Sequence, residues 1–112
     1  MRSLLVLLAL FGLTAACQRT AEQQQADTVR SDALKRGDAI EKQGDIQADR
    51  LQQQASNLQN EAEQAGGMTG ERLKIRADAL DQESKVIRRQ ADMQADAIKE
   101  EAGARIKASK SR

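Results

Sequence analysis

The chain has 112 residues, with 18 Lys and Arg against 17 Asp and Glu, and it contains no His, Pro, Trp or Tyr. Between residues 18 and 112 only 13 of 95 residues are Leu, Ile or Val, about 14%, which is below the roughly 20% at which a globular core becomes doubtful. Ala, Glu, Lys, Leu and Arg make up 46 of the same 95 residues, as is typical of long helices. This composition argues against a pocketed enzyme, a β-fold and a disulfide scaffold.

The N-terminus has the layout of an export signal. Arg2 supplies a positive charge, and an apolar run of eight residues follows over 4–11. Eight residues make a helix of about 12 Å, which is too short for a hydrocarbon core of about 30 Å. Small residues at 14–16 then provide a cleavage site. We therefore expect residues 1–16 to be a signal peptide, folded as a helix before its removal.

The residues that end this segment are Leu13-Thr14-Ala15-Ala16-Cys17, and they resemble the lipobox of bacterial lipoproteins, with Leu four residues before the cysteine. The resemblance implies cleavage before Cys17, a fatty acid such as palmitate on its sulfur, and a membrane-anchored protein. It also implies the periplasmic face of the outer membrane, because Gln18 stands where an Asp would favour the inner membrane. Cys17 is the only cysteine, so an intramolecular disulfide is excluded. The alternative is a plain secretory signal cut after Ala16.

Two helical stripes follow a polar linker expected over residues 17–25. Apolar and small residues lie three or four apart from Ala26 to Ala65, in eleven steps with a mean of about 3.5, the period of a coiled-coil seam. A second stripe runs from Leu73 to Ile106 in nine steps with a mean of about 3.7, nearer an 11-residue repeat. We predict helices over 26–65 and 71–108. Their large seam residues are Ile40, Leu51, Leu58, Leu73, Leu80, Ile87 and Ile98.

Three glycines within residues 66–70 separate the stripes and predict a turn, with Thr69 capping the second helix. The expected fold is therefore all-α, an antiparallel helical hairpin or coiled coil. A single extended rod is the alternative. Gly37 and Gly44 lie on the first stripe, where they either let another backbone approach closely or merely weaken the helix.

Catalytic and cofactor sites are not expected. The chain has no His for acid–base chemistry, its serines lack a recognisable activating base, and its paired carboxylates lack a calcium loop. It also has no phosphate loop, zinc spacing or aromatic platform for nucleic acid. We predict no enzyme activity, no metal, no cofactor and no nucleic-acid partner.

The C-terminal segment is basic, because residues 103–112 contain no acid and four cations: Arg105, Lys107, Lys110 and Arg112. These cations are expected either to contact anionic lipid or cell wall weakly, or to stabilise the helix end and keep residues 109–112, the basic tail, soluble.

A structural role in the cell envelope fits these features: a spacer, a tether or a helix-mediated interaction module. The architecture is similar to that of small helical envelope lipoproteins such as murein lipoprotein. An Ala-rich two-helix seam buries little apolar area, so self-association or a helical protein partner is expected. The alternatives are an amphipathic stress or lipid-binding protein that folds on a surface, and a helical regulatory or inhibitor subunit of an envelope enzyme.

Overall fold

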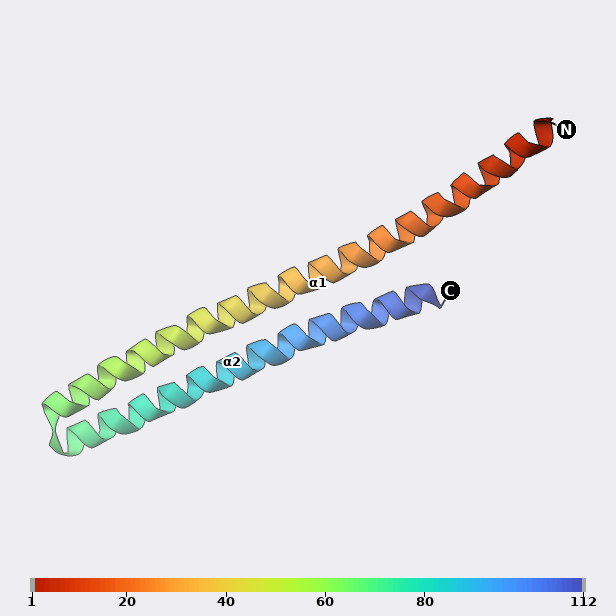
Figure 1. Ribbon diagram of the computed structural model, residues 1–112. Coiled ribbons are helices and arrows are strands. Elements are labelled where there is room, and N and C mark those ends of the chain that lie inside the picture. The colour runs from red at the N-terminus through yellow and green to blue at the C-terminus, as the bar shows by residue number, and fades with distance from the viewer. Residues whose placement is uncertain (1, 112) are drawn as a thin grey trace.

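The structure, a computed structural model, describes the backbone of residues 2–111 and the side chains of residues 21–111. It consists of α1 (Arg2–Ala65) and α2 (Gly67–Lys110), which run antiparallel and side by side (Figure 1). The described residues contain no strand. The prediction of an all-α helical hairpin is therefore confirmed, and the extended rod is excluded.

The turn is much shorter than the predicted segment 66–70. Gly66 is the one non-helical residue between the helices, and Gly66 and Gly67 have φ values of 63° and 58°. Glycine adopts this left-handed region without the steric penalty that a Cβ brings. The Gly66 N–H donates to the Ala62 carbonyl at 3.0 Å, and the Gly70 N–H donates to the Gly66 carbonyl at 3.0 Å. Thr69 lies inside α2 and is not its cap, because the helix starts two residues earlier.

The first helix is longer than predicted. Residues 17–25, expected as a polar linker, continue α1 toward its N-terminus. The sequence explains the difference, since no Gly or Pro lies between Cys17 and Arg36 and most residues of the segment are good helix formers. As a result α1 extends past the C-terminal end of α2 (Figure 1), and the longest dimension of the molecule is 100 Å.

The centre of the hairpin is built almost wholly from small residues. Gly44 illustrates the reason: a Cβ placed on it would lie 2.5 Å from the Ala91 Cβ, so the two helices approach too closely there for any side chain. This settles the question of Gly44 in favour of a close approach. The buried positions are Ala33, Gly37, Gly44, Ala48, Ala55 and Ala62 of α1, with Gly70, Ala77, Ser84, Ala91, Ala95, Ala102 and Ile106 of α2.

The spacing of these buried residues changes along the hairpin. Near the turn they repeat every 7 residues, at 48, 55 and 62 in α1 and at 70, 77, 84 and 91 in α2. In the open half they repeat every 11, as in the pairs 33/44 and 37/48 of α1 and 91/102 and 95/106 of α2. The sequence predicted one mean spacing for each helix. In the structure both spacings occur in both helices, the 7-residue repeat near the turn and the 11-residue repeat in the open half. Both helices change period at about the same level, as partners that wind together must.

Candidate functional site

One flank of the seam is apolar, and we call it the apolar edge. Its seven residues are half-buried, and each follows a buried small residue by three positions in the chain. Val29 precedes buried Ala33 by four positions, just as the edge residues of α1 precede the next buried residue, and it lines one open recess together with Ile98 of α2. These positions of α1 and α2 therefore face a common side. The apolar edge consists of Ile40, Leu51, Leu58, Leu73, Leu80, Ile87 and Ile98. The sequence predicted these residues as the helix seam, whereas the structure places small residues at its centre and the large ones on its flank.

The opposite flank carries polar side chains, and we call it the charged edge. Arg88 of α2 reaches three residues of α1: its Nη2 lies 2.7 Å from Asp49 Oδ1 and 3.4 Å from Gln52 Oε1, and its Nε lies 3.6 Å from Asp45 Oδ1. Further toward the open end, Lys99 Nζ lies 3.6 Å from a Glu41 carboxylate oxygen. The charged edge is thus Glu41, Asp45, Asp49, Gln52, Arg88 and Lys99.

The charged edge was not predicted from the sequence, although its pattern is present there. Gln52, Arg88 and Lys99 each follow a buried small residue by four positions, where the apolar residues follow by three. These pairs are partly or largely exposed to solvent, so each contributes only about 0.2–1 kcal/mol. Their main effect is to select the alignment of the two helices.

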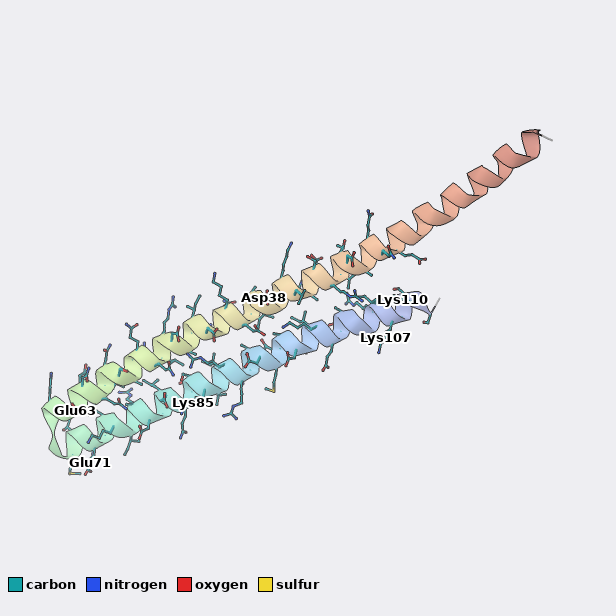
Figure 2. The ribbon with its side chains drawn as sticks, in the orientation of Figure 1. Asp38, Glu63, Glu71, Lys85, Lys107 and Lys110 are labelled. Carbon is teal, nitrogen blue, oxygen red and sulfur yellow. The ribbon has the colours of Figure 1, made fainter. Side chains whose placement is uncertain are left out.

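The basic residues of the C-terminal segment lie at the open end of the hairpin. Lys107 and Lys110 are exposed in the last turn of α2 (Figure 2), and buried Ile106 holds this turn against α1. Arg105 is less available, because its Nη2 lies 2.6 Å from Glu101 Oε1 of its own helix. Arg112 lies outside the described residues.

The proposed lipidation site belongs to the same end of the molecule. Arg105 and Val29 line one recess, so the end of α2 lies level with residues just before Val29. Cys17 precedes Val29 by twelve residues of α1, about 18 Å along the helix axis. The side chain of Cys17 lies outside the described residues, so the structure does not describe its surroundings.

The described side chains form no obvious catalytic or metal-binding constellation. Over residues 21–111 no three Cys, Asp or Glu side chains converge in a way that would hold a metal ion. Ser84, Ser109 and Ser111 donate their hydroxyls to carbonyls three residues earlier in their own helix. No helix in the described part of the chain is both long and apolar enough to cross a membrane. The main surface features of the hairpin are therefore its apolar edge and its charged edge.

Comparisons with protein-family models, with curated proteins and with solved structures found no match to this chain.

Proposed function

We propose that the protein is a lipid-anchored helical spacer or tether of the bacterial cell envelope, held by an acylated Cys17. The observation that carries the proposal is the direction of the hairpin: its open end, and not its turn, adjoins the residues that follow Cys17. From residue 17 to the turn at residue 66, α1 spans about 75 Å. An anchored hairpin would hold its turn at about that distance from the membrane.

The basic end of α2 supports this orientation. Lys107 and Lys110 follow Arg105 along α2, in the direction of Cys17, because the helices are antiparallel. Each cation near an anionic membrane contributes on the order of 1 kcal/mol. One acyl chain gives only marginal membrane binding, while two or more chains, or one chain with a basic cluster, give stable anchoring. The lipid and the basic end would therefore act together.

The interaction surface fits a structural role better than a chemical one. The apolar edge and the charged edge both extend along the hairpin, and the recess that Val29 and Ile98 line between the helices is open to solvent. A spacer needs stiffness, length and a defined attachment point, and two helices closely packed along most of α2 supply the first two. The proposed location is the periplasmic face of the outer membrane, as the lipobox and Gln18 suggest.

The anchor is tested with the full chain produced in a bacterium fed an alkyne-labelled palmitate. We expect wild-type protein to be labelled, to have its amino terminus at residue 17 and to fractionate with membranes. Cys17→Ala should be unlabelled and uncleaved, while Ser56→Ala, a small change in an exposed helical residue, should behave as wild type. An unlabelled wild-type protein that begins at residue 17 and is released with the soluble fraction would contradict the proposal.

A further inference from the structure

We propose that the apolar edge is the interface with a second copy of this chain, so that two hairpins pack into a four-helix bundle. The proposal deepens the proposed function, on which it rests, by naming the partner of the spacer. It begins from the unequal flanks of the hairpin. Arg88 and Lys99 close the charged edge by bridging to α1, whereas the Leu and Ile residues of the apolar edge are only half-buried by the partner helix.

The apolar edge has the size that a stable dimer requires. Residues 33–62 of α1 pack against α2 over about 45 Å, and two adjacent helices are about 20 Å wide. A second hairpin laid on this face would cover about 900 Å² of each copy, close to the roughly 800 Å² per partner of standard stable interfaces. A partner presenting one short helix would leave much of the stripe exposed, whereas a second copy matches its length.

The polar residues that border the edge favour the same partner. The border consists of the residues that directly precede a buried residue, because a helical turn places them on the same flank as the apolar edge. In the middle of the hairpin they are uncharged, exposed glutamines: Gln43, Gln47 and Gln54 of α1 and Gln90 and Gln94 of α2. Glutamine amides both donate and accept hydrogen bonds, so identical rows of them can face each other without repulsion. Toward the turn the border carries Glu61, Arg76 and Glu83, and toward the open end Arg36 and Glu101.

Both ends of the border therefore contain both signs of charge. A second copy meets no block of like charge, whichever way round it lies. A membrane surface fits less well, because helices that lie on anionic lipid carry Lys and Arg beside their apolar face. Here the border has five glutamines and more acids than bases. The two exposed lysines of the last turn of α2, Lys107 and Lys110, lie at the end of the hairpin and not along this border.

The test compares two sets of three substitutions in the full chain, purified in a mild detergent. The edge variant combines Gln47→Glu, Gln54→Glu and Gln94→Glu, which places charge on the border of the proposed interface. The control variant combines Gln53→Glu, Gln64→Glu and Gln82→Glu, which makes the same chemical change at exposed positions off that border. Sedimentation equilibrium gives the number of protein copies per particle, and circular dichroism confirms that each variant keeps its helices.

We expect wild type and the control variant to contain two copies, and the edge variant to dissociate at least tenfold more readily with unchanged helix content. Monomeric wild type over the accessible concentrations, or equal weakening by both variants, would overturn the proposal. Wild type that is monomeric and binds neutral phosphatidylcholine vesicles, with binding lost only in the edge variant, would assign the edge to lipid and also overturn it.

A second measurement does not depend on the effect of added charge. A cysteine at Gln47, which is near the middle of residues 33–62 and so lies level with its counterpart in either orientation, should be joined to that counterpart by a short bifunctional maleimide, while a cysteine at Gln53 should not. Mass spectrometry of the same preparations reports acylation of Cys17, which separates the two proposals. An unacylated dimer would remove the lipid anchor and leave the interface standing, and an acylated monomer would do the reverse.

Discussion

Gly44 and Gly37 occupy similar buried positions on α1, yet their surroundings differ. A Cβ on Gly44 would lie 2.5 Å from the Ala91 Cβ, whereas a Cβ on Gly37 would meet the Lys99 Cε at 3.1 Å and the Ala95 Cβ at 3.6 Å. The Lys99 Cε belongs to a long, flexible side chain that can move aside, but the Ala91 Cβ is fixed to the backbone. We therefore expect Gly37 to tolerate substitution by Ala better than Gly44, although both glycines are buried on the same stripe.

We predict that Gly44→Ala destabilises the protein by about 1–3 kcal/mol, because overpacking outweighs the gain of about 1 kcal/mol in helix propensity. Gly37→Ala should be neutral or slightly stabilising. Thermal unfolding followed by circular dichroism measures both. Adding Ala91→Gly to the Gly44→Ala variant should recover the packing term, since it removes the methyl group that the new Cβ meets. Equal losses for the two single variants would contradict the close approach.

Arg88 shows how residues of modest energy select one alignment of two helices. Its guanidinium contacts Asp49, Asp45 and Gln52 across the charged edge. A stripe of Ala residues distinguishes one register from the next only weakly, because all its side chains have the same shape. The charged contacts make neighbouring registers unequal, which is the role we assign to them.

At the scale of elements, the seam requires small residues at its centre, and the two helices supply them in matched periods. Ala48, Ala77 and Ala95 are 0% exposed. Small side chains let the helix backbones approach closely, and the larger apolar residues then fill the flank. At Ala48, Ala77 and Ala95 a larger side chain would therefore be overpacked.

The centre of the seam is tested by two substitutions that sit two residues apart. Ala77→Leu should destabilise the hairpin by about 1–3 kcal/mol through overpacking, whereas Ala79→Leu, at an exposed position, should change stability by less than about 0.5 kcal/mol. Leu and Ala have similar helix propensities, so propensity alone predicts little difference. Chemical denaturation gives both values, and a tolerant Ala77 would mean that the helices are further apart than described.

The turn is the second critical element, because Gly66 and Gly67 both have positive φ. Left-handed backbone costs roughly 1–2 kcal/mol for a residue with a Cβ. Gly66 combines φ 63° with ψ 178°, a region that is essentially confined to Gly. We therefore predict that Gly66→Ala and Gly66→Asn both destabilise the hairpin by about 1–3 kcal/mol, because the positive-φ region that Asn enters has a ψ of about 47°. Thermal melts of the two variants measure the losses. A variant as stable as wild type would show that the turn does not need Gly at residue 66.

At the scale of the whole molecule, the hairpin brings the C-terminal end of α2 back toward the segment that follows Cys17. The chain thereby places its basic end and its proposed lipid at one extremity and the turn at the other (Figures 1 and 2). From Cys17 onward the chain has 17 basic and 17 acidic residues, and hence no formal net charge. Its charge is nevertheless unevenly placed, and the proposed spacer would be oriented by this polarity.

Reversing two charges at either extremity tests that polarity. Lys107→Glu with Lys110→Glu should weaken binding of the full chain to vesicles containing anionic lipid by at least tenfold, at about 1 kcal/mol per cation. Arg72→Glu with Lys74→Glu makes the same charge change near the turn and should have little effect. Vesicle co-sedimentation at low salt measures both. Equal weakening by both variants would show that only net charge matters.

The all-α fold class, the presence of two helices and the position of the turn between them were all predictable from the sequence. These follow from local physics: apolar spacing near 3.6, good helix formers throughout, and glycines at 66, 67 and 70. The lipobox resemblance at Cys17 was equally local. It remains a prediction, as do the linked expectations of membrane location and structural role.

Which residues of each stripe lie at the centre of the seam, and which lie on its flank, depends on how the two helices pack together. A stripe of residues three and four apart contains both central and flanking positions. The sequence of a single helix does not show which residues take which position. The antiparallel partner determines this, because it covers Ala77 completely and leaves Leu80 only half-buried. The turn is likewise shorter than the spacing of the glycines suggested, because its length depends on the φ and ψ angles of Gly66 and Gly67. Arg88 contacts residues that lie 36 to 43 positions away in the chain, and these contacts form only because the hairpin brings the two helices together.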